Sequence, residues 1–264
     1  SKVYNGLQKH LALDDVSFTI DKGEIIVMIG PNGAGKTTLM NVMTGSLEPS
    51  AGTLVLLGHE ETDRFIEVQN YLGVCFQDNI LLPYLSVKEH FKLFGTFRGM
   101  SDVQIKEQFE TFTNALELDR MVDNRAGDLS GGQKRKLCIS ISLLGDPPVV
   151  VMDEPTAGVD VQSRQTIWKV IASLKESTTI ITSHALEEAE AVCSRLFIMS
   201  EGQLVFKGTS TELRNKYKVG YVMRIDPIES LGVVLGVIQS FIPDAKQDPD
   251  HEDGILLPVS FDIP

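Results

Sequence analysis

The 264-residue sequence predicts an α/β fold in which a mostly parallel β-sheet is wrapped by helices. Short, almost wholly apolar runs, typical of buried parallel strands, alternate with segments of helical periodicity. A helix-rich stretch at about 80–145 separates two of these strands and is expected to form a helical insertion. Residues 1–218 are expected to form the main domain. Residues 219–264 are expected to form a fragment of an α+β domain, too small for a strong core of its own.

Local sequence patterns predict where the strands and helices lie. An alternating polar and apolar pattern predicts a half-buried antiparallel strand at 13–20. Buried or β-rich runs predict strands at 24–29, 53–57, 71–76, 149–152 and 178–182, and a hairpin at 195–199 and 204–207. Helical spacing predicts helices at 36–44, 131–144, 167–175 and 185–194, and a helical stretch over about 87–118. The final fragment is expected to contain a strand at 221–225, a helix at 231–241 and a strand at 255–261.

Composition limits the function classes. The formal charge is −12, from 24 Lys and Arg against 36 Asp and Glu, which argues against a nucleic-acid partner. No apolar stretch approaches the roughly 18 residues that a membrane helix needs, and the apolar run near the end, 232–242, is shorter. Because the first residue is Ser1 rather than Met, we expect a piece of a longer polypeptide.

Neither of the two sets of potential metal ligands predicts a metal site. Cys75, Cys138 and Cys193 are widely spaced without a CxxC pair, so small buried thiols are expected. The cluster 251–253, of sequence His-Glu-Asp, is flanked by Asp, Pro and Gly residues and is expected to be a solvated turn.

Residues Gly30–Thr37 match the phosphate-binding pattern G-x-x-x-x-G-K-[ST], between an expected buried strand and an expected helix. Glycines let backbone N–H groups surround an anion, and the helix start adds its positive end. We expect Lys36 to reach the β- and γ-phosphates of ATP and Thr37 to bind Mg²⁺. Further ATP contacts are expected from Asn32, Gly33, Ala34, Gly35 and Thr38.

Asp153 and Glu154 directly follow the apolar run 149–152. This places Asp153 at the carboxyl end of a central strand, where it can hold Mg²⁺ through water. Glu154 can then polarise the water that attacks the γ-phosphate, as a general base. The two carboxylates and the phosphate loop together predict ATP hydrolysis.

The pentapeptide Leu-Ser-Gly-Gly-Gln at 129–133 opens an expected helix, where Ser130 and the amides of Gly131 and Gly132 can form a second anion site. With this signature the sequence resembles the ATP-binding cassette (ABC) family. Further family motifs follow in order over residues 1 to about 218: the adenine-stacking aromatic, the Q-loop glutamine, the D-loop and the switch histidine, at Tyr4, Gln77, 155–160 and His184.

The resemblance implies a P-loop NTPase (RecA-like) core with an antiparallel β subdomain and an inserted α-helical subdomain. It implies that His184 contacts the γ-phosphate, and that Gln77 ligates Mg²⁺ or its water. It further implies that Ser130–Gln133, the signature of one domain, faces the ATP of a second domain, so that two domains sandwich two nucleotides head to tail.

The resemblance to the family also implies a transporter at the cytosolic face of a membrane, with transmembrane domains that dock on the helical insertion near residues 81–84. The alternative is a soluble ABC-type ATPase of translation or DNA repair, but the chain has no long coiled coil before the signature and is acidic. A metabolic kinase with a phosphate loop is excluded by the signature.

Three stretches look most like the A subfamily of lipid exporters, at 73–79, 157–160 and 213–221. This likeness implies export of a hydrophobic substrate such as a lipid. It also implies that the fragment from about 220 belongs to that subfamily's regulatory domain. Phe76 departs from the expected pattern, where a Pro would stand.

Overall fold

The computed structural model describes residues 1–5, 9–60, 71–184, 190–217, 221–224, 230–243, 245–247 and 254–257. These residues form two compact units, Ser1–Lys207 and Gly208–Pro264. The domain boundary expected after residue 218 stays a prediction.

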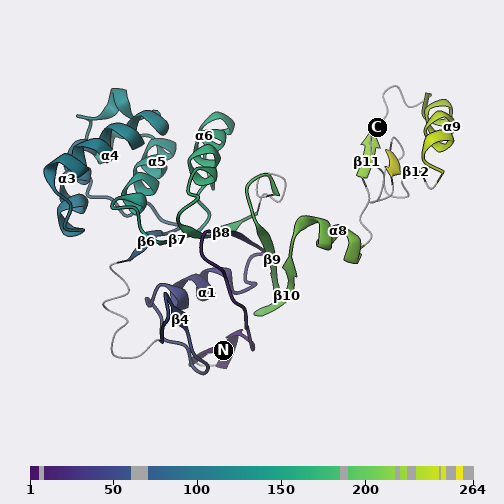
Figure 1. The fold of residues 1–264 in the computed structure, drawn as a ribbon, viewed down its shortest axis with the longest axis horizontal. Helices are drawn as coiled ribbons and strands as arrows, with labels where there is room; N and C mark the ends of the chain where they lie inside the picture. The colour runs from purple at the N-terminus through teal and green to yellow at the C-terminus, as the bar shows by residue number, and fades with distance from the viewer. Residues whose placement is uncertain are drawn as a thin grey trace. The chain divides into compact units, whose positions relative to one another are not determined.

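The first unit is built on a six-stranded sheet (Figure 1). Strands β3, β7 and β8 lie at its centre, and each pair of neighbours among β9, β3, β8, β7 and β6 is parallel. In sheet order the strands are β10 (Gln203–Gly208), β9 (Arg195–Ser200), β3 (Ile25–Ile29), β8 (Thr178–Ser183), β7 (Val149–Met152) and β6 (Leu72–Cys75). The structure thus confirms the predicted α/β fold and its buried central strands.

Helices cover both faces of this sheet. Figure 1 shows α1 (Lys36–Met43) on one side and α5 (Gly131–Leu143) and α6 (Val161–Ala172) on the other. Ile26 and Met28 of β3 are completely buried in a cluster that includes Leu39 and Met43 of α1. Alternate residues of a strand share one face, so this packing fixes α1 on the sheet directly after β3.

The helical insertion contains α3 (Val87–Phe97), α4 (Asp102–Ala115) and the short 3₁₀ helices Asp119–Met121 and Ala126–Asp128. The helical stretch expected at 87–118 is confirmed, and the chain turns within it, between α3 and α4. Gly99 has a φ of 71° there, a conformation that ends helices, and Ser101 then caps α4 by accepting a hydrogen bond from Gln104 N.

Two small antiparallel sheets complete the first unit. They pair β1 (Lys2–Asn5) with β2 (Lys9–Leu13), and β4 (Val55–Leu56) with β5 (His59–Glu60). The strand expected at 13–20 is wrong beyond Leu13, since Asp15 has a φ of 46° and the chain leaves the strand conformation. Val16, Phe18 and Ile20 nevertheless pack against the core, which explains their alternating pattern.

Helix α6 and the hairpin of β9 and β10 can be compared with what the sequence predicts. Helix α6 begins at Val161, before the expected residue 167, because Asp160 accepts a hydrogen bond from Ser163 N and caps it. The expected hairpin is confirmed, with positive φ at both Glu201 and Gly202, as two-residue hairpin turns require. Most of the helix expected at 185–194 lies outside the described residues.

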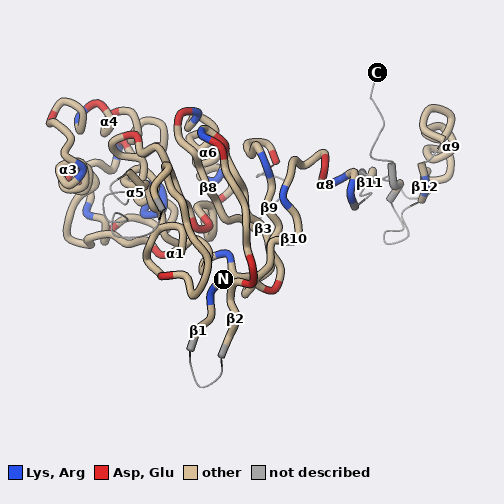
Figure 2. Tube along the Cα trace, turned by 60° about the horizontal axis from the view of Figure 1, so that its bottom comes forward, with Lys and Arg blue, Asp and Glu red and all other residues tan. Residues whose placement is uncertain are grey.

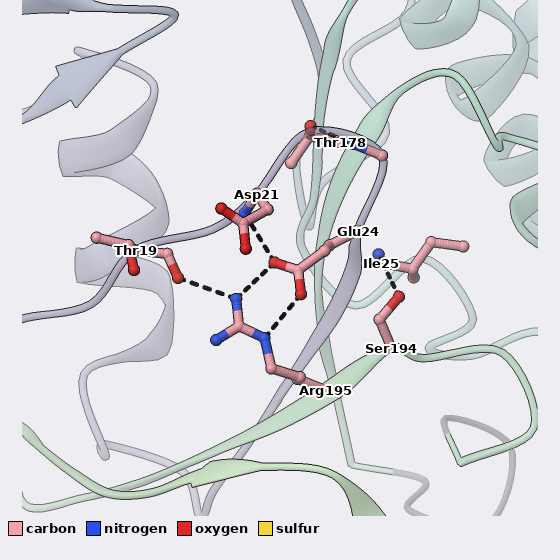
Figure 3. A network of polar contacts seen from close by, with 8 residues as sticks. Thr19, Asp21, Glu24, Ile25, Thr178, Ser194 and Arg195 are labelled. Carbon is pink, nitrogen blue, oxygen red and sulfur yellow. Dashed lines mark hydrogen bonds and ion pairs between the residues drawn. The ribbon is translucent and has the colours of Figure 1, made fainter.

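Charged residues lie at the ends of the central strands rather than along them (Figure 2). At the amino end, Arg195 donates to both carboxylate oxygens of Glu24, at 2.9 and 2.5 Å, and to Thr19 O (Figure 3). Asp21 N also donates to Glu24, at 2.7 Å. Burial raises the pKa of Glu24, but these hydrogen bonds outweigh it and lower the pKa overall. The turn before β3 is thereby tied to the start of β9.

The second unit contains α8 (Ser210–Tyr217), β11 (Tyr221–Arg224), α9 (Leu231–Phe241), β12 (Lys246–Gln247) and β13 (Gly254–Leu257). Its sheet has the order β11-β13-β12, and Leu231, Ala245 and Ile255 form its core. The predicted strand, helix and strand are confirmed in the described part, whereas residues 251–253 lie outside it. None of the described helices has the length and apolarity needed to cross a membrane.

Candidate functional site

The phosphate loop, Gly30–Thr37, joins β3 to α1 and has its shape fixed by backbone contacts. Gly35 has a φ of 98°, and a Cβ there would lie 2.6 Å from Ala12 O. A Cβ on Gly30 would lie 2.3 Å from Met199 O. Both glycines are therefore required by close backbone approach. Gly202 N also donates to Ala34 O at 3.1 Å, which ties the loop to the β9–β10 turn.

Lys36 is only 6% exposed and its ammonium group lies within this loop. Its Nζ donates to Gly30 O at 2.7 Å and to Pro31 O at 3.1 Å. Burial lowers the pKa of Lys36, while the charges of Glu154 and Asp153 act in the opposite direction. The structure thus brings the loop lysine and the two carboxylates into one electrostatic site, as the sequence predicts.

Asp153 and Glu154 follow β7 at the carboxyl end of the sheet. Asp153 is 6% exposed and accepts a hydrogen bond from Thr182 of β8, with 2.5 Å between Asp153 Oδ1 and Thr182 Oγ1. Glu154 has an unusual φ of 47°, and its Oε1 lies 2.5 Å from Nε2 of His184. Because β7 and β8 are parallel neighbours, their carboxyl ends place the predicted base beside the predicted switch histidine.

The oxygen donors predicted for magnesium suit that ion chemically. Mg²⁺ prefers oxygen ligands, and it usually binds through one or two carboxylates, waters and substrate phosphates. Thr37 and Gln77 are exposed, and Asp153 keeps a second carboxylate oxygen besides the one bonded to Thr182. Thr37, Gln77 and Asp153 remain the predicted ligands.

Tyr4 lies near the phosphate loop. Its side chain is 40% exposed, and its hydroxyl lies 3.5 Å from Thr38 Oγ1 at the start of α1. An exposed aromatic ring at this place offers a surface on which a base can stack. Stacking on adenine remains a prediction, and so do the ATP contacts of Asn32 and Gly33, which are both exposed.

The signature lies at the start of α5 and caps it. Ser130 Oγ accepts from Gln133 N at 3.3 Å, and Gln133 Oε1 accepts from Ser130 N at 2.9 Å. Gly131 is exposed, with no atom within 4 Å of a Cβ built on it. Among the described residues, no hydrogen bond or ion pair joins the signature to the phosphate loop. The helices that the two predicted anion sites open, α1 and α5, lie on opposite sides of the sheet (Figure 1).

Arg135 is a residue that sequence analysis missed. It is 3% exposed and donates to four backbone carbonyls: those of Phe76, Gln77, Asp153 and Pro155. One guanidinium thus connects the signature helix to the segments that carry Gln77 and Asp153. Its sequence context, a run of three basic residues at 134–136, resembles an exposed helix face and gives no indication of this burial.

We expect Arg135→Lys to lower stability by about 2–3 kcal/mol and to reduce ATP hydrolysis, because one ammonium group cannot reach carbonyls that a planar guanidinium joins. Urea unfolding and phosphate release measure the two effects. Lys134→Ala is the matched control, since partly exposed Lys134 donates to Gly127 O, outside the carbonyls that Arg135 joins. Wild-type stability and hydrolysis in Arg135→Lys would contradict the connecting role.

The three cysteines are free thiols. Burial raises the pKa of Cys75 to about 11, of Cys138 to about 12 and of Cys193 to about 11. Cys75 is buried and the other two are half-buried, as expected for structural thiols.

Comparison with known proteins identifies a matching family, proteins of similar sequence and a solved structure of similar fold. Residues 13–157 match the family model described as ABC transporter. The human "Cholesterol transporter ABCA5" is 38% identical over 248 residues, covering 90% of this chain and 15% of the relative. The Arabidopsis thaliana "ABC transporter A family member 7" is 39% identical over 253 residues, covering 93% of this chain and 27% of the relative. The chain therefore spans a small part of both proteins.

A solved structure shares the fold. It is the dimeric, post-hydrolysis state of the ATP-binding cassette MJ0796 with ADP and Pi. The TM-score is 0.73 and the identity 24%, with 79% of this chain and 95% of that chain covered.

Proposed function

The chain belongs to the ABC transporter family as an ATPase domain of the A-subfamily type, and we propose that it hydrolyses MgATP in a head-to-tail pair with a second such domain to power export of a hydrophobic, lipid-like substrate. The observation that carries the proposal is the Glu154–His184 contact beside Lys36 and the phosphate loop.

Each of these groups has a role in hydrolysis. The loop amides and Lys36 hold the β- and γ-phosphates, where negative charge increases in the transition state. The Glu154 carboxylate accepts a proton from the attacking water, and His184 orients that carboxylate and contacts the γ-phosphate. Mg²⁺, held by Thr37, Gln77 and Asp153, would neutralise phosphate charge when bound.

The signature supports the need for a second domain. It caps α5 at an exposed place, and no hydrogen bond joins it to the phosphate loop among the described residues. A second copy can present its own Ser130–Gln133 to the nucleotide that this chain holds. The relative of known structure is described as dimeric, which agrees with such a pair.

The substrate and the membrane partner are inferred from relatives and from one exposed edge. A human relative is named as a cholesterol transporter, which favours a lipid-like substrate. Ile80, Leu82 and Tyr84 follow Gln77 and are 66%, 46% and 83% exposed. Apolar side chains exposed together often mark a protein contact. We assign this edge to transmembrane domains, which would place the chain at the cytosolic face of a membrane.

Complementation between two inactive variants tests the head-to-tail pair. Lys36→Met disables the phosphate loop, and Gly131→Asp places a negative charge where the partner's phosphate would lie. Since space around Gly131 is open and acidic residues suit a helix start, Gly131→Asp should fold normally. Alone, each variant has one defect in every site.

Mixing the two variants is expected to restore hydrolysis, since a mixed pair contains one site with an intact loop and an intact signature. Phosphate release is measured against the mixing ratio, with each variant alone as control. Gly131→Asp alone at the wild-type rate, or a mixture no more active than its parts, would refute the head-to-tail arrangement.

A further inference from the structure

We propose that Thr182 is a positioning residue for hydrolysis, whose hydroxyl holds the backbone of the catalytic Glu154 against the carboxylate of Asp153. The inference rests on the proposed function and assigns a role to a residue outside all the motifs above. Thr182 lies on β8 and is completely buried.

The Thr182 hydroxyl uses both of its hydrogen-bonding abilities at the site. It donates to Asp153 Oδ1 at 2.5 Å and accepts from Glu154 N at 2.8 Å. A hydroxyl can do both at once, whereas neither a methyl group nor a carboxylate can. Thr182 therefore joins the side chain of one site residue to the main chain of the next.

The backbone of Glu154 needs such support. Its φ of 47° is in the left-handed region, which is unfavourable for residues other than Gly, Asn and Asp. Such a conformation persists only when its surroundings fix it. Two hydrogen bonds do so on the main chain: Glu154 N donates to Thr182, and Glu154 O accepts from Ala157 N at 3.1 Å.

The segment that carries Thr182 also leads to His184, which contacts the same Glu154. β8 ends at Ser183, and His184 follows directly at the carboxyl end of the sheet, two positions after Thr182. Thr182 thus holds the main chain of Glu154 while His184 contacts its carboxylate. Loss of the hydroxyl frees the Glu154 backbone to relax, and the carboxylate then moves away from its position beside the phosphate loop.

The same strand provides a matched control. Thr179 is also completely buried on β8, but its hydroxyl has no hydrogen-bond partner within the part of the chain that the structure describes. Thr182→Val and Thr179→Val are therefore the same isosteric change in the same strand. Only the first removes contacts to the site.

The 264-residue chain is tested as wild type, Thr182→Val, Thr182→Ser and Thr179→Val. We expect Thr182→Val to lower kcat by roughly tenfold to a hundredfold, the cost of a misplaced catalytic group, with KM and the affinity for a fluorescent MgATP analogue nearly unchanged. Thr182→Ser keeps the hydroxyl and is expected to recover most of kcat. Thr179→Val is expected to match the wild type.

Amide hydrogen exchange gives a readout that does not depend on hydrolysis. The amide of Glu154 is expected to exchange faster in Thr182→Val than in the wild type, Thr182→Ser or Thr179→Val. If Thr182→Val does not fold, Thr182→Ala replaces it in both measurements.

Three results would overturn the inference: unchanged kcat in Thr182→Val, an equal loss in Thr182→Ser, or unchanged exchange at Glu154. A wild-type chain that binds MgATP without releasing phosphate would instead count against the proposed function, and the exchange experiment would still decide the role of Thr182.

Discussion

Glu154→Gln is expected to stop steady-state phosphate release while MgATP binding remains. The substitution keeps the size of the side chain but removes the carboxylate that accepts the proton from water. General-base catalysis contributes on the order of 10²–10⁴ in rate, so release should fall by about that factor. The contact with Nε2 of His184 can be kept by the Gln carbonyl oxygen, so the site should stay assembled.

The measurement pairs phosphate release with the affinity for a fluorescent ATP analogue. Glu176→Gln is the matched control, because Glu176 is exposed and precedes the amino end of β8, away from the carboxyl ends that carry the site. If Glu154→Gln released phosphate at the wild-type rate, Glu154 would not be the base. If it lost ATP binding instead, the role of Glu154 would be structural.

Local sequence patterns were sufficient to predict the ATP site's main parts. The phosphate loop, Asp153 and Glu154 are each adjacent in sequence to a buried apolar strand, and parallel strands bring their carboxyl ends to one edge. The contact of Glu154 with His184 follows from the same rule. The strand pattern and the phosphate-loop motif together were therefore enough to place Lys36 and Glu154, 118 positions apart, in one site.

Other features depend on contacts that periodicity does not encode. Phe18 and its neighbours alternate as in a strand because one side of the segment packs on the core, although it forms no strand. Arg135 is in a basic run yet is buried, since four carbonyls from distant segments surround it. Thr182 resembles any β-branched strand residue, and only the φ of Glu154 reveals why its hydroxyl is needed.

Lys36→Met is expected to weaken MgATP binding by roughly a hundredfold and to reduce hydrolysis at least as much. A Met side chain fills similar volume but removes the ammonium group. A charge-assisted hydrogen bond to phosphate contributes about 1.5–3 kcal/mol, and a hundredfold loss corresponds to about 2.7 kcal/mol, so the net loss of one such contact accounts for this change. The fold should survive, because the loop is also fixed by the close packing of Gly30 and Gly35.

Titration with the fluorescent ATP analogue measures the loss of affinity, and thermal unfolding checks the fold. Lys22→Met is the control, since Lys22 is exposed in the turn before β3, at the other end of that strand. Undiminished affinity in Lys36→Met would mean that the loop amides alone hold the phosphates.

Because Lys36 already donates to Gly30 and Pro31, ATP must compete with those carbonyls for the ammonium group. Its net contribution to binding is therefore the difference between phosphate and carbonyl as acceptors, which is large because only phosphate carries a full charge.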